Sequence, residues 1–205
     1  GDLPSIYSEK ILRAPQCFEA ESHPLQAEVL EKLQTVDPKK KGGAINIAIN
    51  AKVMKLSYRL LSICERLIKN TENEIIFHFF PGEVGIYDDG VRALIKRSLP
   101  TAIIYPTSNY LEFLLKLSKC DFCLSAFPFG NTNCTVDACL LKMPVVAHFG
   151  IENGAQTDSM VMESVNYPIW FVCHGDDEYY ATAKRLVDEI AAGLDPRSHL
   201  VDTIP

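Results

Sequence analysis

From residue 44 onward, the sequence predicts an α/β fold in which a doubly wound parallel sheet is covered by helices on both faces. Three observations support this prediction. Six short apolar runs alternate with stretches of helical periodicity. The runs are continuously apolar, as in strands that are buried on both faces. Strands and helices that alternate in this order connect by right-handed crossovers, which favours a Rossmann-like sheet.

The predicted strands are short and rich in β-branched or aromatic residues, which favours a strand over a buried helix of equal hydrophobicity. They are the runs 44–49 (AINIAI), 74–80 (EIIFHFF), 101–105 (TAIIY), 121–126 (DFCLSA), 144–148 (PVVAH) and 168–173 (PIWFVC).

Between these strands, apolar residues recur at the spacing of one helix face. In the first helix Leu60, Ile63 and Leu67 share that face, and in the last helix Ala183 and Leu186 do. The predicted helices are 56–70, 87–98, 108–118, 133–142, 154–165 and a last helix that starts at about Asp176 and ends before Gly193.

The chain divides into three predicted parts. Residues 1–43 contain three prolines and end on the basic stretch DPKKKGG, which predicts an N-terminal arm or linker. Residues 44–193 hold the alternating pattern and form the predicted Rossmann-like domain. Residues 194–205 form a predicted C-terminal tail, and the sequence contains no internal repeat.

Composition narrows the function classes. The chain has 20 basic and 26 acidic residues and a formal net charge of −6, which gives no support for nucleic-acid binding, since that needs a basic surface. No apolar run approaches the ~20 residues of a membrane span, and the first residues lack the pattern of a signal peptide. We therefore expect a cytoplasmic protein without a membrane span.

The seven cysteines are odd in number and lie mostly within apolar runs, which predicts buried free thiols in a reducing compartment. Cys120 and Cys123 form a CxxC motif, but the sequence offers no second ligand pair for zinc. A strand also places positions three apart on opposite faces. We interpret both cysteines as structural and predict no metal site.

Ligands of such sheets bind at the carboxyl ends of the strands, where the loops enter the helices. Four predicted loops lie there and are expected to converge on one edge of the sheet. They are 50–55 (NAKVMK), 81–86 (PGEVGI), 127–133 (FPFGNTN) and 149–154 (FGIENG).

The loop FPFGNTN is the most informative of the four. A helix N-terminus presents free N–H groups and a partial positive charge, which suits a phosphate. Gly130 permits a tight turn and the close approach of a ligand, and Asn131, Thr132 and Asn133 add side-chain donors. Small polar residues are also common helix caps, so the local pattern leaves a phosphate cradle and an ordinary N-cap equally open.

Three charged residues complete this candidate site. Asp137 lies one turn after Asn133 on the same helix face, where it could accept ribose hydroxyls or have a structural partner. Lys52 and Lys55, in the first strand-to-helix loop, could reach phosphates at the neighbouring loop or be solvated surface lysines. The five histidines show no Ser-His-Asp or metal-ligand spacing, so no catalytic residue is predicted.

Several sequence elements occur together in one known order. They are Met54-Lys55 after a strand, FHF at 77–79, KCD at 119–121, FPFGNTN followed by Asp137, and DEYY…A…RL at 177–186. In this order they resemble the C-terminal, UDP-sugar-binding half of the bacterial cytosolic protein N-glycosyltransferases that modify adhesins. Those enzymes stand with the O-linked N-acetylglucosamine transferases in glycosyltransferase family 41. The resemblance covers residues 44–190, and FPFGNTN is its specific element.

The resemblance implies one half of a GT-B fold that binds a UDP-sugar, UDP-glucose or UDP-N-acetylglucosamine, without a metal. The implied reaction transfers a hexose to an asparagine, serine or threonine side chain of a protein. By the same resemblance, Lys55 contacts the diphosphate, Thr132 and Asn133 lie by the phosphates, and Asp137 holds the ribose. The N-terminal GT-B half is then supplied by the same polypeptide or by a partner chain.

The chain departs from the family pattern at four places. Thr107 stands where the family has a nucleotide-side histidine, and Lys52 where it has a small hydroxyl residue. The loop at 82–85 is shorter and lacks a family asparagine, and GIENGAQTD lacks the family's histidines. A second hypothesis is therefore a non-catalytic nucleotide-binding or interaction module derived from a GT-B half. A third is an unrelated α/β enzyme, flavodoxin-like or epimerase-like, with a phosphate loop.

Overall fold

The computed structural model describes residues 43–82, 85 and 88–200, together with the single residues 8, 28 and 31. Almost all of the predicted arm 1–43, part of the loop 81–86 and residues 201–205 of the predicted tail lie outside the described residues.

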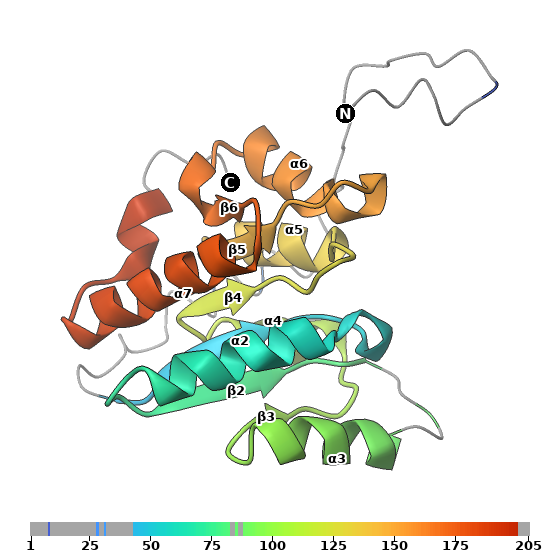
Figure 1. Cartoon of the computed structure of the whole chain (residues 1–205), viewed down its shortest axis with the longest axis vertical. Coiled ribbons are helices and arrows are strands. Elements are labelled where there is room, and N and C mark those ends of the chain that lie inside the picture. Colours follow the sequence, from blue (N-terminus) through green and yellow to red (C-terminus); the bar gives the residue numbers. More distant parts are fainter. Residues whose placement is uncertain are drawn as a thin grey trace.

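Six parallel strands form one sheet with the spatial order β3-β2-β1-β4-β5-β6 (Figure 1). The strands are β1 (Ile45–Ile49), β2 (Ile75–Phe79), β3 (Ile103–Ile104), β4 (Phe122–Leu124), β5 (Val145–His148) and β6 (Val172–Cys173). Most apolar runs of the sequence become buried strands because helices cover both faces of the sheet, whereas Ile103 of the edge strand β3 is exposed. In β1, for example, Ile47 and Ala48 point to opposite faces, and neither is exposed.

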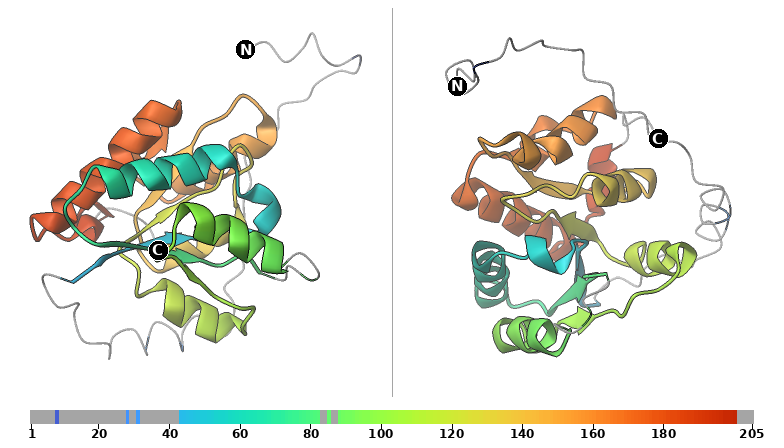
Figure 2. Two further views of the ribbon diagram at one scale, coloured as in Figure 1. Left: turned by 60° about the horizontal axis from the view of Figure 1, so that its bottom comes forward. Right: turned by 90° about the vertical axis from the view of Figure 1, so that its right-hand side faces the viewer.

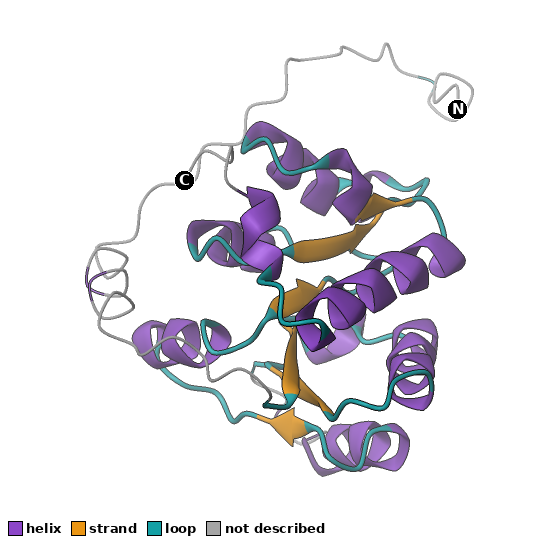
Figure 3. Cartoon of the chain, turned by 90° about the vertical axis from the view of Figure 1, so that its left-hand side faces the viewer, coloured by secondary structure: helices purple, strands orange, loops and turns teal. Residues whose placement is uncertain are grey.

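The helices form two layers. They are α2 (Tyr58–Lys69), α3 (Asp88–Ser98), α4 (Tyr110–Leu117), α5 (Asn133–Leu140), α6 (Thr157–Ser164) and α7 (Asp176–Ala191). One layer contains α2, α3 and α7, and the other contains α4, α5 and α6 (Figure 2, Figure 3). Within the described residues, no helix combines the length and the apolarity that crossing a membrane requires.

The direction of winding reverses between β1 and β4, which are neighbours in the sheet. Ile47 pairs with Phe122 and Ala48 with Cys123, while the chain leaves β1 toward β2 and leaves β4 toward β5, on the other side. The loops after β1 and β4 therefore lie side by side at the carboxyl ends of these strands, and ligands of doubly wound sheets bind at such a point. The predicted α/β, Rossmann-like fold is confirmed.

The last predicted strand, 168–173, is shorter than expected. Ile169–Phe171 form a 3-10 helix, and only Val172–Cys173 pair with β5. Pro168 has no N–H to donate to a strand ladder, and the Trp170 ring stacks on Phe171 with the ring centroids 3.9 Å apart. Local stacking thus replaces strand pairing in the first half of this apolar run.

The described cysteines are free thiols, and Cys120 and Cys123 are both buried, as predicted. Burial raises the pKa of the Cys123 thiol far above its ordinary value, so it stays protonated and unreactive.

In the predicted tail, Pro196–Leu200 form a 3-10 helix in which Arg197 donates to the carbonyl oxygen of Cys120 at 3.1 Å. The three-part division of the chain stays a prediction.

Candidate functional site at the carboxyl ends of β1 and β4

A lysine joins the loops that follow β1 and β4. Lys55 ends a short 3-10 helix (Val53–Lys55), and its Nζ donates a hydrogen bond to the carbonyl oxygen of Gly130 at 2.5 Å. Lys52 lies in the same loop but is exposed, and Lys55 is half-buried. The two loops therefore converge as the fold predicts, and Lys55 lies against the FPFGNTN turn.

The turn is held by an aspartate of α6 that sequence reasoning missed. Asp158 is 2% exposed, and its Oδ1 accepts the N–H groups of Asn131 and Thr132 at 2.8 and 2.7 Å. Its Oδ2 accepts from Asn131 N–H at 2.9 Å and from the Ser125 hydroxyl. Asn131 Nδ2 donates to Ser125 Oγ at 3.0 Å. A carboxylate of the chain itself thus occupies two N–H groups at this helix start.

The backbone of the turn is unusual at two positions, Gly130 and Thr132. A Cβ added at Gly130 would lie 2.5 Å from Thr157 Oγ1 and 3.1 Å from Asp158 Cγ. The side of Gly130 on which a Cβ would stand is therefore filled by α6. Thr132 has a φ of 46°, in the left-handed region that β-branched residues rarely adopt.

The three polar residues of the turn differ in exposure. Asn131 is buried, Thr132 is half-buried and Asn133 is exposed. Thr132 occupies the N-cap position of α5 without a side-chain capping bond, so the interpretation of the turn as an ordinary N-cap is not supported. Of the three predicted side-chain donors, Asn133 is the one that faces solvent.

Asp137, on α5, is bonded to a tyrosine of α4. The phenol of Tyr110 donates to Asp137 Oδ1 at 2.5 Å. Thr107 is exposed in the loop that leads into α4, three residues before Tyr110. The structure thus places the loop of Thr107 on the α5 side of the sheet, although β3 and β4 are separated by two other strands. The Tyr110 partner of Asp137 has no signal in the sequence, because the two residues lie 27 positions apart.

The positive charges of Lys52 and Lys55 influence the first turn of α5 electrostatically. The pKa of the Cys134 thiol is raised to about 11, first by burial and then by the charge of Asp137, while the charges of Lys55 and Lys52 act to lower it. Within the described part of the chain, neither lysine takes part in an ion pair, so their positive charge is not neutralised by a carboxylate there.

Two buried amide atoms at this edge have no hydrogen-bond partner among the described residues. They are Nδ2 of Asn50, at the end of β1, and Oδ1 of Asn131, in the turn after β4. Asn50 is 4% exposed and Asn131 6% exposed. Buried polar atoms are usually paired, so unpaired ones at a strand end indicate a place where a polar group can bind.

A second polar cluster joins α2 to the start of α7. Arg59 Nε donates to Asp176 Oδ2 at 2.8 Å, and its guanidinium lies 5.3 Å from the centroid of the Phe127 ring. His148, at the end of β5, stacks on Phe127 at 4.6 Å, and its Nε2 lies 3.4 Å from Asp176 Oδ1. Burial lowers the pKa of His148, and Asp176 opposes this shift. The Arg59 hydrogen bond lowers the pKa of Asp176.

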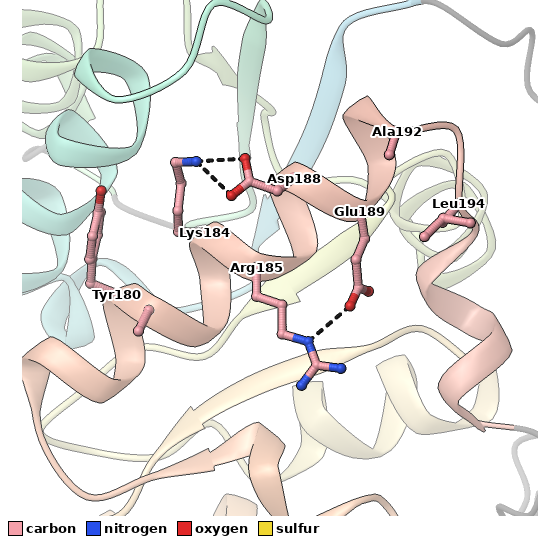
Figure 4. A pocket seen from close by; sticks show the side chains of 8 residues that line it. Tyr180, Lys184, Arg185, Asp188, Glu189, Ala192 and Leu194 are labelled. Atoms are coloured by element: carbon pink, nitrogen blue, oxygen red, sulfur yellow. Dashed lines mark hydrogen bonds and ion pairs between the residues drawn. The ribbon is translucent and has the colours of Figure 1, made fainter.

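A shallow hollow along α7 is not part of this site. Tyr180, Leu194 and the charged residues of α7 line it (Figure 4). Its charges pair with each other, Lys184 with Asp188 and Arg185 with Glu189, so they offer little to a ligand.

Within residues 43–82, 85 and 88–200, no group of three His, Cys, Asp or Glu side chains is placed to hold a metal ion.

Comparison with known proteins finds similarity to protein glucosyltransferases over nearly the whole chain. The chain is 29% identical over 201 residues to a UDP-glucose:protein N-beta-glucosyltransferase of Actinobacillus pleuropneumoniae serotype 7. The enzyme of serotype 5b is 29% identical over 199 residues. The resemblance predicted from the sequence is confirmed. These matches cover 97% and 96% of the chain but 32% of each relative, and no protein-family model matches.

Two solved structures share the fold. An O-GlcNAc transferase of Thermobaculum terrenum superposes with a TM-score of 0.63 at 14% identity, covering 80% of this chain and 33% of that one. A UDP-GlcNAc 2-epimerase of Neisseria meningitidis superposes with a TM-score of 0.55 at 17% identity, covering 86% and 49%. At such identities the likeness establishes the fold alone.

Proposed function

We propose that this chain is the UDP-sugar-binding half of a GT-B protein glycosyltransferase. The whole enzyme would transfer a hexose from UDP-glucose or UDP-N-acetylglucosamine to an asparagine, serine or threonine side chain of a protein. The observation that carries the proposal is the Lys55 contact with Gly130, which places an unneutralised cation against the β4–α5 turn at the switch point of the sheet. Similarity over nearly the whole chain to protein N-beta-glucosyltransferases supports the donor class.

The proposed roles follow from the positions of the side chains. Lys55, Asn133 and the start of α5 stabilise the negative charge that develops on the UDP leaving group as the bond to the sugar breaks. Thr132, and Asn131 beneath it, shape the turn that presents these groups. The carboxylate of Asp137, which Tyr110 holds through a hydrogen bond to Oδ1, accepts hydrogen bonds from the ribose hydroxyls. Thr107 lies on the nucleotide side of the same site, and no metal is needed because the lysine and the helix dipole supply the positive charge.

The domain division belongs to the same proposal. Residues 44–193 form the nucleotide-binding half, with residues 1–43 as an arm and 194–205 as a tail. Because the relatives are about three times as long as the matched region, the acceptor-binding half is proposed to come from a further domain or a partner chain. Exposed apolar side chains around the site, such as Met54 and Phe129, suit a surface that meets another domain. The cytoplasm is the proposed location.

A titration with UDP tests this function. Lys55→Ala should weaken UDP binding at least tenfold, because a charge-assisted hydrogen bond to phosphate contributes about 1.5–3 kcal/mol. The melting temperature should stay close to that of the wild type, since Lys55 is only half-buried. Lys119→Ala, an exposed lysine at the opposite edge of the sheet, is the matched control. Equal affinities of wild type and Lys55→Ala, measured by isothermal titration, would contradict the proposal.

A second candidate is a non-catalytic nucleotide-binding or interaction module. One observation favours it: the two carboxylates at the turn, Asp137 and Asp158, are both engaged in hydrogen bonds and neither is positioned as a free general base. A thermal-shift screen of nucleoside diphosphates and their sugars separates the candidates. Stabilisation by UDP-sugars beyond that by UDP supports a donor site for transfer, whereas no response to any nucleotide supports an interaction module.

A further inference from the structure

Asp158 makes all of its described hydrogen bonds to the segment between β4 and α5. One oxygen bridges the successive N–H groups of Asn131 and Thr132, and the other accepts from the Ser125 hydroxyl. The residue lies in the first turn of α6, 26 and 27 positions later in the sequence, and it is 2% exposed. A buried carboxylate in this place is fully engaged with the backbone of the candidate phosphate turn.

This arrangement changes which groups are open to a phosphate. Free N–H groups at a helix start attract anions, and Asp158 has already satisfied two of them. The N–H of Asn133, the first residue of α5, is not among the groups that Asp158 binds. A bound phosphate would therefore meet Asn133 and Lys55, one residue further along the turn.

The backbone conformation of the turn also has to be stabilised by contacts from outside the turn. Thr132 is kept at a φ of 46° and a ψ of −89°, an unfavourable conformation for a β-branched residue. Such conformations persist where the surrounding structure determines them. The two N–H groups that donate to Asp158 Oδ1, those of Asn131 and Thr132, both lie directly before the Cα of Thr132. A Cβ at Gly130 would lie 3.1 Å from Cγ of the same carboxyl group.

We propose that Asp158 is a positioning residue for the donor phosphate. Its carboxylate locks the Asn131–Thr132 peptide and withholds these N–H groups, so that the phosphate is directed to Lys55 and the N-terminus of α5 at Asn133. The inference rests on the proposed UDP-sugar site and adds a residue that does not touch the ligand. It acts through the geometry of the turn.

Two substitutions at Asp158 separate geometry from charge. Asp158→Asn keeps an oxygen that can accept both N–H groups, and its amide can donate to Ser125 Oγ. Asp158→Ala removes every one of these bonds. Asp121→Ala is the matched control, because Asp121 is also buried and accepts a backbone N–H, that of Asn46 at 2.7 Å, but before β4 at the opposite edge of the sheet.

The experiment measures UDP affinity by isothermal titration on the full chain, under conditions where thermal melting shows each variant folded. We expect Asp158→Ala to bind UDP at least tenfold more weakly, Asp158→Asn to stay within about threefold of the wild type, and Asp121→Ala to match the wild type. A purely structural role predicts lower melting temperatures for both alanine variants but unchanged affinity of the folded protein. That result, or an Asp158→Asn variant as weak as Asp158→Ala, overturns the inference.

Amide NMR distinguishes failure of this inference from failure of the proposed function. In the wild type, added UDP should shift the Asn133 amide signal more than those of Asn131 and Thr132. In Asp158→Ala, the Asn131 and Thr132 amides should exchange with solvent faster. If the wild type does not bind UDP, both the proposed function and the inferred placement of the phosphate at Lys55 and Asn133 are overturned. A wild type that binds UDP through the amides of Asn131 and Thr132 overturns the role of Asp158 alone.

Discussion

Charged side chains at the β4–α5 turn and on the outer face of α7 make different kinds of contact. Asp158 is buried and binds backbone groups that lie 26 and 27 residues away in the sequence. On α7, Lys184 and Asp188 lie one helical turn apart and bind each other, with side chains 24% and 58% exposed. The first contact determines the course of the backbone, whereas the second lies on a helix whose apolar face already packs on the sheet.

The physical difference is the cost of leaving a group unpaired. A buried carboxylate or N–H that loses its partner keeps its desolvation penalty, so contacts at the turn are worth more than their direct energy. Exposed groups on α7 exchange a partner for water at little cost. Substitutions at the two places should therefore differ in stability, and only those at the turn should change nucleotide binding.

Gly130→Ala should have the largest effect on stability. The added Cβ would lie 2.5 Å from Thr157 Oγ1 and 3.1 Å from Asp158 Cγ, and Asp158 is fixed by its own hydrogen bonds. We expect a loss of about 2 kcal/mol in the free energy of unfolding, as is typical of overpacking, measured by urea denaturation. Adding Thr157→Ala should recover part of the loss. A Gly130→Ala variant as stable as the wild type would show that the turn can yield to α6.

Asp137→Ala should change binding more than folding. If its carboxylate holds the ribose, UDP affinity should fall about tenfold, or 1.4 kcal/mol, while the affinity for inorganic pyrophosphate should not change. Tyr110→Phe is the matched control, because it removes the phenol partner but keeps the carboxylate. Titration calorimetry with both ligands checks this, and an equal loss of affinity for UDP and pyrophosphate would mean that the substitution disturbs the phosphate turn, which would contradict a role of Asp137 at the ribose.

The sequence predicts those features that depend on local pattern and topology. Continuous apolar runs indicate a sheet covered on both faces. The carboxyl ends of parallel strands lie at one edge of the sheet, so the loops after them are expected to converge there, and Lys55 does contact Gly130. The predicted helix start at Asn133 is correct, since α5 begins at that residue. These inferences need no knowledge of which side chains meet across the fold.

Features that depend on distant side-chain contacts could not be predicted. Asp158 follows an unremarkable polar loop, and its partners are backbone groups of another element. Gly130 suggested a tight turn that a ligand can approach, but the packing of α6 against this glycine could not be predicted, because the local sequence does not define the position of α6. Residues 168–173 have the composition of a strand, yet ring stacking and Pro168 produce a 3-10 helix in their first half.

The first turn of α7 is intermediate between the buried β4–α5 turn and the exposed outer face of α7. Substitution there should have a smaller effect on stability, and this effect should depend on pH. Asp176, Arg59, His174 and Tyr179 surround His148, and burial lowers its pKa below the ordinary 6.5. The folded state therefore binds this proton less readily than the unfolded state, so stability is fully present above pH 6.5 and falls as the pH drops through the lower folded pKa.

Urea unfolding between pH 7.5 and 5.5 measures this effect. The wild type should lose stability over this range, and His148→Gln should lose less, because it cannot take up the proton. Equal slopes for the wild type and His148→Gln would assign the pH dependence to other groups.

Lys184→Ala should have the smallest effect of all. A surface ion pair at the i, i+4 spacing contributes about 0.3–0.5 kcal/mol, so the free energy of unfolding should change by no more than that, and UDP affinity should not change. A double-mutant cycle with Asp188→Ala isolates the pair. A coupling energy above about 1 kcal/mol would mean that the charges of α7 are organised beyond their local pairing. The Asp158 contacts and the Lys184–Asp188 pair would then differ mainly in that Asp158 binds backbone groups, and no longer in burial alone.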